Sequence, residues 1–245
     1  MSSILIHVPH ASTHIPAEYL PSYLAPDLHE EILCMTDWYC DDLFECGQEM
    51  VVFPYSRLLC DVERFVVDSM EAMSRVGMGM AYTRCANGAT LRHVPPELRA
   101  AIYSKFYNPH HAQLTESTEQ KLAKYGRCLL VDGHSFHPTP LPYEFDQSPD
   151  RPDFCIGTDT FHTSSEQARF SVEFFCSRGY TVARNRPFSG TLVPMQFYHN
   201  DARVQSIMLE INRKLYMNDQ AEKTAQYPKI KQLISEWISE LESLF

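Results

Sequence analysis

Residues 127–137 read Arg-Cys-Leu-Leu-Val-Asp-Gly-His-Ser-Phe-His, and this stretch indicates both a fold class and the place of a site. The apolar run at residues 129–131 is bounded by Gly126 and Gly133, which is typical of a buried strand. A polar cluster begins where the run stops, and it consists of Asp132, His134, Ser135 and His137. Sites in open α/β sheets form at the carboxyl ends of strands. We therefore expect this cluster to belong to a site.

The N-terminal segment has the same form. A mostly apolar run at residues 4–8 leads into Pro9 and His10, and the following loop continues to His14. Imidazole is the commonest protein metal ligand, and a hydrolytic zinc site needs three protein ligands and an open position. Two strands that each deliver a histidine into a loop therefore suggest a metal-dependent hydrolase. Neither segment has the compact spacing of His-Glu-x-x-His.

Strand-like and helix-like segments alternate along the chain. This alternation predicts one α/β domain over residues 1–245, with a mixed central sheet flanked by helices on both faces. We expect strands at residues 2–9, 50–53, 57–62, 128–132, 153–157, 180–184 and 204–211, with a hairpin at 187–194 between the last two. We expect helices at residues 27–46 with Asp27 as N-cap, at 95–124 with an interruption near Pro109, from Ser164 or Ser165 to Gly179, and at 227–245.

Two further segments are informative about packing and access. The loop at residues 137–152 carries five prolines and is long enough to suggest a lid over a site. The last expected helix carries an apolar stripe with helical spacing, which predicts core packing. The stripe consists of Ile230, Leu233, Ile234, Trp237, Ile238, Leu241 and Leu244.

Composition excludes several classes of protein. The 245 residues carry a formal net charge of −10, so we expect no nucleic-acid partner. No apolar run approaches the roughly 18 residues of a membrane span. Met1 to Ser3 lead directly into the first expected strand, without the features of a secretory signal. We therefore expect a cytoplasmic protein without a membrane partner, and the oligomeric state stays open.

The eight cysteines form no Cys-x-x-Cys pair, and some of them, such as Cys60 and Cys128, fall in apolar stretches. In a chain without an export signal, this pattern favours reduced, buried thiols over disulfides. A cysteine nucleophile stays open, although no cysteine has a histidine beside it in an evident motif.

Five sequence blocks follow one another between residues 7 and 217. They are HVPHASTHIP at 7–16, SRLLCDVERF at 56–65, FYNPHH at 106–111, VDGHSF at 131–136 and LEINRKLYM at 209–217. In series they resemble the N-formylglutamate amidohydrolase family, and the resemblance covers nearly all of the chain. It implies a fold similar to that of zinc exopeptidases of the carboxypeptidase type. It also implies hydrolysis of N-formyl-L-glutamate to formate and glutamate, late in one route of histidine degradation.

The resemblance implies one zinc ion, or another divalent metal, held by three residues. His10 matches the histidine of the family's opening block, and His134 matches the histidine of its Asp-x-His-Ser block. Asp37 matches a Thr-Asp pattern and is the expected third ligand, with Asp61 or another acid as the alternative. A solvated acidic helix face is the competing interpretation of Asp37.

Glu210 is the expected general base. It lies in a β-like apolar run at residues 206–211, where an unpaired acid is costly to bury. The resemblance implies that it takes a proton from the water that zinc activates, whereas a salt bridge with Arg213 or another arginine is the structural alternative. The resemblance also implies that Arg64 assists the developing oxyanion.

The implied substrate is a small acidic N-acyl amino acid with two carboxylates, and guanidinium groups suit bidentate carboxylate binding. We therefore expect Arg57, Arg184, Asn185 and Arg186 to bind substrate, and His111 resembles a family histidine near the site. A solvated surface charge is the alternative for each arginine.

The chain departs from the family pattern in two places. Glu63 stands where the family has Asn before Arg64, and residues 187–191 depart from a Phe-x-Gly-Gly pattern. Either departure could alter the acyl group or the amino acid accepted. A related N-acyl-amino-acid or peptide hydrolase therefore remains an alternative. A non-catalytic module that binds metal and ligand is the alternative from another class.

Overall fold

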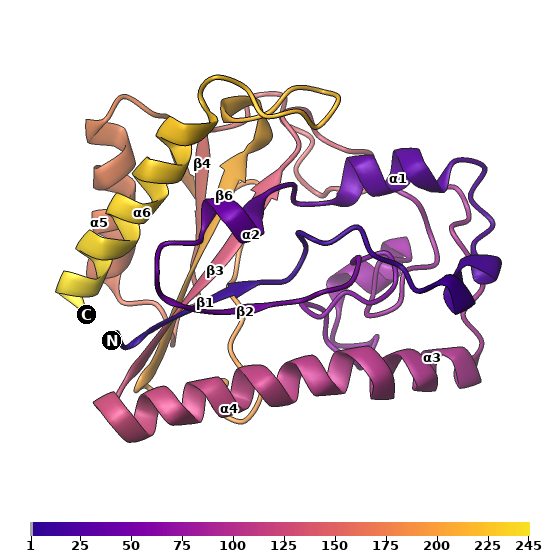
Figure 1. Ribbon diagram of the computed structural model, residues 1–245, viewed down its shortest axis with the longest axis horizontal. Coiled ribbons are helices and arrows are strands. Elements are labelled where there is room, and N and C mark those ends of the chain that lie inside the picture. The colour runs from indigo at the N-terminus through magenta and orange to yellow at the C-terminus, as the bar shows by residue number, and fades with distance from the viewer. Residues whose placement is uncertain (1) are drawn as a thin grey trace.

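Six strands form one mixed sheet through the centre of the molecule, which the computed structural model describes over residues 2–245 (Figure 1). Their order across the sheet is β2-β1-β3-β6-β4-β5. The strands are β1 (Ile4–Val8), β2 (Glu49–Val52), β3 (Cys128–Phe136), β4 (Phe154–Gly157), β5 (Val182–Arg184) and β6 (Val204–Asn212). Strands β1, β2, β3 and β6 pair in parallel, whereas β4 is antiparallel to β6 and parallel to β5. The predicted α/β class with a mixed sheet is confirmed.

Helices cover both faces of this sheet (Figure 1). They are α1 (Leu28–Met35), α2 (Cys40–Leu43), α3 (Pro96–Ile102), α4 (Asn108–Tyr125), α5 (Ser165–Ser177) and α6 (Tyr227–Leu244), with short helical turns η1 (Ala17–Ser22), η2 (Ala72–Val76), η3 (Tyr103–Tyr107) and η4 (Arg213–Leu215). On one face, Phe175 of α5 and Trp237 of α6 pack against strand residues such as Val131. On the other face, Leu114 of α4 packs with Leu130.

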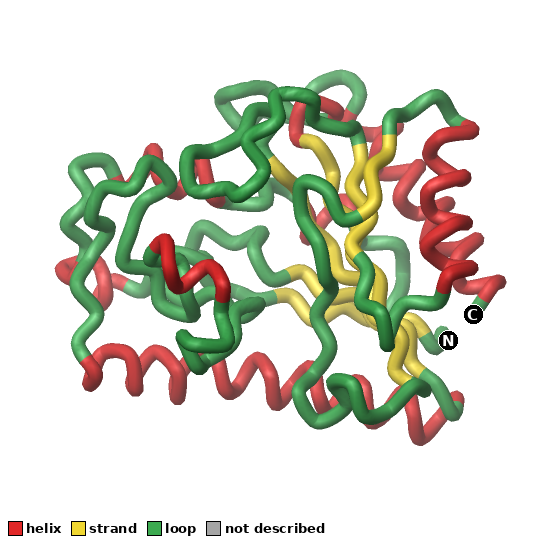
Figure 2. Tube along the Cα trace, turned by 180° about the vertical axis from the view of Figure 1, so that it is seen from behind, coloured by secondary structure: helices red, strands yellow, loops and turns green. Residues whose placement is uncertain are grey.

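A second apolar core lies beyond the end of the sheet, among the long segments that precede β3. It includes Leu58, Leu59, Tyr82 and Ile102, all fully buried. Figure 2 shows that this part of the molecule consists mainly of loops and short helices, and that β1 leads from the N-terminus toward it. The loops after the strands therefore have a packed support of their own.

The predicted helix at residues 27–46 is wrong in its middle, where a loop separates α1 from α2. α1 begins after the N-cap Asp27, as expected. Tyr39 then takes a left-handed conformation with a φ of 66°. The Asp37 N–H donates to the His10 carbonyl at 3.0 Å, so the break brings Asp37 against the loop that follows β1. Asp37 therefore does not lie on a solvated helix face.

The predicted strand at residues 57–62 is also wrong, because these residues form turns. The Cys60 N–H donates to the Ser56 carbonyl at 3.3 Å, as in a helical turn. Leu58 and Leu59 are both fully buried in the second core. In a strand, adjacent side chains point to opposite faces of the sheet. Here both leucines are buried in the same core, so the run is apolar because it is buried on all sides and not because it pairs in a sheet.

The helical region expected at residues 95–124 is confirmed as α3 and α4, but the interruption lies before Pro109. A π-helical turn, η3, joins the two helices. Pro109 follows this turn directly in a backbone that stays helical, and its ring nitrogen cannot donate to a carbonyl of the preceding turn. The widened turn ahead of it absorbs the irregularity.

The strand expected at residues 128–132 continues to Phe136, because β6 pairs with β3 along its whole length. His134 consequently lies inside β3 and not in the loop after it. The predicted hairpin at residues 187–194 is wrong, because β4 lies between β5 and β6 in the sheet. Those residues belong instead to a long connection.

The structure supports the predictions made for the two helices nearest the C-terminus, α5 and α6. Ser164 is the N-cap of α5 and forms a reciprocal capping box with Gln167. The apolar stripe of α6 is buried as expected, except for Leu244, which is 42% exposed in the last turn.

All eight cysteines are free thiols, and five of them are buried. Among residues 2–245, no helix has both the length and the apolar character that crossing a membrane requires.

Gly133 places β3 directly against α2. A Cβ at this position would lie 2.8 Å from Cδ2 of Phe44, and Phe44 is fully buried. A glycine inside a strand often marks such a close approach. Because Gly133 separates Asp132 from His134, a shift of the strand here would displace both side chains.

Gly133→Ala should lower the free energy of unfolding by about 1–3 kcal/mol, as overpacking of a filled core does. Phe44→Leu should relieve the contact, so the two changes together should cost less than the sum of their separate costs, with a coupling of about 0.5–3 kcal/mol. Urea denaturation of the two single variants and the double variant measures this coupling. Strictly additive costs would show that the Phe44 ring is not the obstacle.

Candidate active site and metal centre

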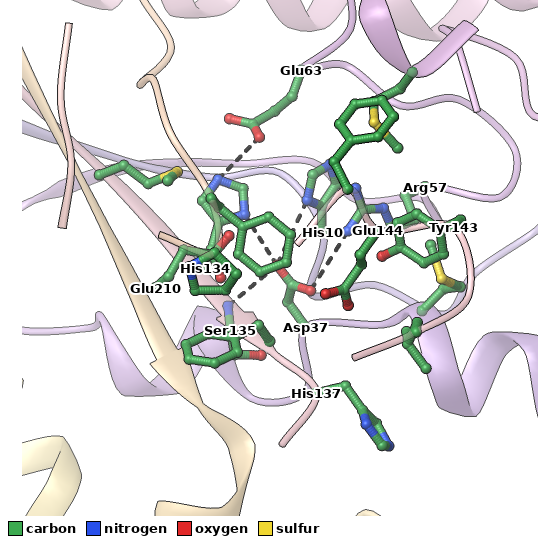
Figure 3. A pocket seen from close by; sticks show the side chains of 18 of the residues that line it. His10, Asp37, Arg57, Glu63, His134, Ser135, His137, Tyr143, Glu144 and Glu210 are labelled. Atoms are coloured by element: carbon green, nitrogen blue, oxygen red, sulfur yellow. Dashed lines mark hydrogen bonds and ion pairs between the residues drawn. The ribbon is translucent and has the colours of Figure 1, made fainter. Parts of the chain in front are cut away.

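A pocket of about 300 Å³ lies where β1, β3 and β6 end (Figure 3). Its lining combines charged and polar groups with an apolar wall. The polar groups are His10, Asp37, Arg57, Glu63, Arg64, Glu71, His134, Ser135, His137, Tyr143, Glu144, Ser189, Glu210 and Arg213. The apolar wall includes Met35, Met73, Phe136, Leu141, Phe145, Phe188 and Met208.

The sheet sets the positions of the strand-borne groups. Side chains two residues apart in a strand share a face, so Asp132 and His134 lie on the face that α4 covers. The parallel register places His134 beside Glu210 of β6 and Asp132 beside His7 of β1. Strand pairing alone therefore brings histidines and carboxylates together.

His10 lies in the loop after β1 and is only 1% exposed. Its Nε2 is 3.0 Å from Oδ1 of Asp61. An ionised carboxylate only accepts hydrogen bonds, so Nε2 carries the proton and Nδ1 keeps its lone pair. Within residues 2–245, that Nδ1 has no hydrogen-bond partner. His10 thus presents a buried lone pair.

His134 is arranged in the same way with its nitrogens exchanged. Its Nδ1 is 3.0 Å from Oδ2 of Asp37, so in the neutral ring Nδ1 donates and Nε2 keeps the lone pair. Nε2 lies 3.1 Å from Oε2 of Glu63 and 3.3 Å from Oδ1 of Asp132. Burial lowers the pKa of His134, but these carboxylates outweigh burial and raise that pKa well above its usual range. The position attracts positive charge.

Glu63 completes a group of three candidate ligands with His10 and His134. Ligand atoms of the three residues lie within 4.8 Å of one another. Two imidazoles and one glutamate are the donor set of several hydrolytic zinc sites. Carboxylates on the opposite ring nitrogens, here Asp61 and Asp37, are what fixes metal-binding histidines in place. The donor set therefore fits a divalent metal.

Asp37, the third ligand expected from the sequence, contacts both histidines. Its Oδ2 lies 3.0 Å from Nδ1 of His134 and 3.6 Å from Nδ1 of His10. Its Oδ1 accepts a bond from Arg213 at 3.1 Å and lies 3.7 Å from Arg57. Burial raises the pKa of Asp37, but the neighbouring His10 and His134 rings and the charge of Arg57 hold it well below its usual range. Its ligand role stays a prediction, and its contacts orient His134.

A second group, His7, Glu63 and Asp132, also brings ligand atoms within 4.8 Å of one another. Here, however, the histidine already has partners on both nitrogens. His7 Nδ1 is 2.9 Å from Asp132 Oδ1, and His7 Nε2 is 2.9 Å from Nε2 of His110. With a proton on His110 Nε2, every contact of His7 is a satisfied hydrogen bond. We therefore regard His7 as structural.

Glu210 lines the pocket beside His134 (Figure 3). It is 7% exposed, and its Oε2 has no hydrogen-bond partner in the described chain. Burial raises the pKa of Glu210 to about 8, helped by Asp37 and Glu63 and opposed by His134. The alternative of a salt bridge with Arg213 is not formed, because Arg213 pairs with Asp37.

The residues expected to bind substrate divide into two sets. Arg57 and Arg64 line the pocket. Arg184, Asn185 and Arg186 do not line it. Arg184 and Asn185 contact Thr158, and Arg186 is half exposed beside Asp146 and Asp150. The cluster is therefore part of a surface network.

His111 faces a neighbouring pocket of about 230 Å³ that shares Glu63 and Arg64 with the first. Its Nε2 is 2.8 Å from the carbonyl oxygen of Val62, and its ring stacks on Tyr107 at 4.1 Å between centroids. Burial lowers the pKa of His111 to about 4, so it is neutral at pH 7. These contacts support the segment that carries Glu63.

Sequence reasoning gave no role to several groups that the fold brings to the pocket. Glu63 was noticed only as a departure from a family pattern. Tyr143, Glu144 and Phe145 come from the proline-rich loop at 137–152, which does line the pocket as its length suggests. Nothing in their spacing identifies these three individually.

The chain is similar to known proteins in sequence and in fold. The sequence profile of the N-formylglutamate amidohydrolase family matches residues 2–217. An N-formylglutamate deformylase of Pseudomonas aeruginosa is 26% identical over 229 residues, which cover 89% of this chain and 83% of the relative.

Two solved structures share the fold. One is an N-formylglutamate amidohydrolase from Ralstonia eutropha, with a TM-score of 0.86 and 21% identity over 99% of this chain and 94% of that one. The other is a gene product of Agrobacterium tumefaciens, with a TM-score of 0.68 and 21% identity over 98% and 92% of the two chains.

Asp61 is the buried anchor behind the pocket. Its carboxylate is fully buried and accepts hydrogen bonds from Arg57 at 2.9 Å, from Tyr82 at 2.6 Å and from the Glu63 N–H at 3.0 Å, besides its contact with His10. Burial raises the pKa of Asp61, but Arg64, His10 and Arg57 hold it well below its usual range. Asp61 therefore stays ionised, and its negative charge is stabilised by several donors at once.

Asp61→Asn should lower the free energy of unfolding by about 3 kcal/mol, because it removes the closest counter-charge of the buried Arg57 guanidinium. Tyr82→Phe removes one hydrogen bond to the same carboxylate and should cost only about 1 kcal/mol. Urea denaturation of both variants gives the comparison. Equal costs would contradict the role of Asp61 as the charge partner that holds this region together.

Proposed function

Because the chain belongs to the N-formylglutamate amidohydrolase family, we propose that it is a metal-dependent amidohydrolase that cleaves the amide bond of a small N-acyl amino acid. N-formyl-L-glutamate, converted to formate and L-glutamate, is the first candidate substrate, since the Pseudomonas relative carries that compound in its name. One observation carries the proposal. His10, Glu63 and His134 bring candidate ligand atoms within 4.8 Å of one another, and the unpartnered Oε2 of Glu210 lines the same pocket.

His10, His134 and Glu63 are the residues that would hold the ion, which we take to be zinc or another divalent metal. A divalent ion there supplies a Lewis acid that polarises the acyl oxygen and lowers the pKa of a water molecule. Asp61 and Asp37 keep the ring nitrogens of the two histidines aligned. Asp37 as third ligand, the assignment that the family resemblance implies, is the competing hypothesis.

Glu210 acts as the general base in this proposal. It takes the proton of the attacking water and then delivers it to the departing amine nitrogen. Its buried position gives a carboxyl group with a pKa near the working range, since burial raises that pKa to about 8. A nearby cation favours the ionised form that can accept a proton.

Arg57 and Arg64 serve the substrate. We expected Arg64 to assist the oxyanion and Arg57 to anchor a carboxylate, but the contacts favour the exchange of these roles. Arg57 reaches toward Asp37, close to the histidines, and can donate to a developing oxyanion. Arg64 lies where the two pockets meet and is the less engaged guanidinium.

A non-catalytic binding module would not explain why Glu210 is buried in the pocket. A binding module gains nothing from a buried carboxyl group without a hydrogen-bond partner, and such a group costs stability. The other enzymatic alternative, a hydrolase for a related N-acyl amino acid or a peptide, uses the same residues and differs only in the walls of the pocket.

Glu63→Gln and Asp37→Asn separate the two hypotheses for the third ligand. Glu63→Gln should weaken metal binding by more than about 100-fold, because it removes a ligand, whereas Asp37→Asn should weaken it by about 10–100-fold through misorientation of His134. Competition with a chromophoric chelator measures both affinities. His134→Ala is the positive control. Glu71→Gln is the matched control, because Glu71 lines the pocket without contacting either histidine, and it should leave affinity unchanged.

A greater loss of affinity in Asp37→Asn than in Glu63→Gln would restore Asp37 as the ligand. Undiminished metal content in His134→Ala would remove this centre from the proposal altogether.

Glu210→Gln keeps the shape of the side chain but cannot accept the water proton. Turnover of N-formyl amino acids should fall by about 10²–10⁴-fold, with metal content preserved. Formate release and metal analysis on the same preparation test this. Turnover close to that of the unaltered protein would reject Glu210 as the base, and an unaltered protein that cleaves no N-acyl amino acid would favour the binding-module alternative.

A further inference from the structure

We infer that the amino-acid part of the preferred substrate carries one carboxylate and an apolar side chain, and that Arg64 is the anchor for that carboxylate. This inference rests on the proposed amidohydrolase function and narrows its substrate class. Three observations carry it: which guanidinium groups are free, how the charges of the pocket balance, and what its outer wall is made of.

Only one of the three pocket arginines is free to bind a carboxylate. Arg213 is fully engaged, with bonds to Asp37, to Ser135 and to the Cys34 carbonyl oxygen. Arg57 donates from Nη2 to Asp61 and from Nε to Tyr82, which leaves Nη1 facing Asp37 at 3.7 Å. Neither can turn a complete fork toward a ligand.

Arg64 differs from these two. Its guanidinium makes no hydrogen bond within the described residues, and the one carboxylate within ion-pair distance is Asp61, with Nε 3.5 Å from Oδ2, while Arg57 and Glu71 lie farther off. The side chain is 19% exposed, and it lines both adjoining pockets. A bidentate contact with one substrate carboxylate is therefore possible here. A second carboxylate finds no comparable partner.

The charge balance of the pocket leads to the same conclusion. Its lining carries the carboxyl groups of Asp37, Glu63, Glu71, Glu144 and Glu210 but only three guanidinium groups. A divalent ion would bring this set close to neutrality. A singly charged substrate then adds one negative charge opposite Arg64, whereas a dicarboxylate adds a second charge that must be desolvated without a partner.

Apolar side chains line part of the pocket, next to polar groups such as Tyr143 and Glu144. Met73, Leu141, Phe145 and Phe188 line it, and the Phe188 ring packs edge-on against Phe136 at 5.9 Å between centroids. Phe145, on the proline-rich loop, is 67% exposed. A ligand side chain of methionine or leucine type would cover this surface and remove it from water, which is favourable. A γ-carboxylate in the same place would lose its hydration.

The test compares three substrates of nearly equal length on the metal-loaded protein: N-formyl-L-methionine, N-formyl-L-glutamine and N-formyl-L-glutamate. We expect kcat/KM to be at least about tenfold higher for the methionine compound than for the glutamate compound, with glutamine between them. Arg64→Lys should lower kcat/KM for all three alike, because they share the α-carboxylate and lysine loses the fork geometry. Arg169→Gln, an exposed arginine on α5, should change nothing.

Phe145→Arg supplies the missing cation at an exposed position of the wall. It should raise kcat/KM for N-formyl-L-glutamate relative to N-formyl-L-methionine by at least about tenfold. Binding is measured separately by calorimetry with the metal-loaded Glu210→Gln variant. This variant should bind N-formyl-L-methionine more tightly than N-formyl-L-glutamate.

The outcomes separate the two proposals. If the protein cleaves N-formyl-L-glutamate as well as or better than N-formyl-L-methionine, the apolar-substrate inference is wrong but the amidohydrolase function is upheld. Absence of turnover for every compound overturns the function. The calorimetric comparison then decides the inference alone, since equal or tighter binding of the glutamate compound rejects it and tighter binding of the methionine compound upholds it.

Discussion

The buried carboxylate of Asp61 joins segments that are far apart in the chain. It contacts His10 in the loop after β1, Arg57 four residues before it in the chain, and Tyr82 in the second apolar core. Such a charge is costly to bury unless all its oxygen lone pairs are used. Here they are used, and as a result the tautomer of His10 is determined, with its Nδ1 left without a hydrogen-bond partner 3.6 Å from Oδ2 of Asp37. The geometry of the candidate metal centre thus depends on one anion behind it.

Asp37 performs the corresponding task for the other histidine. It connects His134 to Arg213, and Arg213 in turn bonds the carbonyl oxygens of Cys34 and Ser135. Each histidine therefore has a carboxylate on one nitrogen and an arginine behind that carboxylate. Two arginines become structural in this arrangement, and the consequence for recognition is direct. The residues that give the centre its rigidity are no longer available to bind substrate carboxylates.

Much of this could be predicted from the sequence, because the decisive signals are local. The apolar runs of β1 and β3, the stop at their polar ends and the helical stripe of α6 each follow from periodicity within a few residues. His10, His134 and Glu210 could be proposed because they stand at or near strand ends in blocks that resemble a family. The prediction of a strand at residues 57–62 is wrong because residues buried in the second core show the same apolar pattern as a buried strand.

Other features depend on contacts between distant residues, which no local pattern contains. The break between α1 and α2 is set by the bond from Asp37 to the His10 carbonyl, and β3 is lengthened by its pairing with β6. The surface position of Arg184 and Arg186 follows from the edge position of β5, and sequence spacing gave no sign of it. Glu63 is the clearest case. It differs from the family pattern by one residue, and only the fold shows that its carboxylate reaches the two histidines.

The central claim is that Glu63, and not Asp37, completes the ligand set with His10 and His134. A crystal structure of the zinc-loaded protein, with anomalous data collected at the zinc absorption edge, tests it most directly. We predict one strong anomalous peak per chain, bonded to Nδ1 of His10, Nε2 of His134 and a carboxylate oxygen of Glu63 at about 2.0–2.2 Å. A peak bonded to Asp37 and to Nδ1 of His134, with Glu63 turned away, would contradict the account.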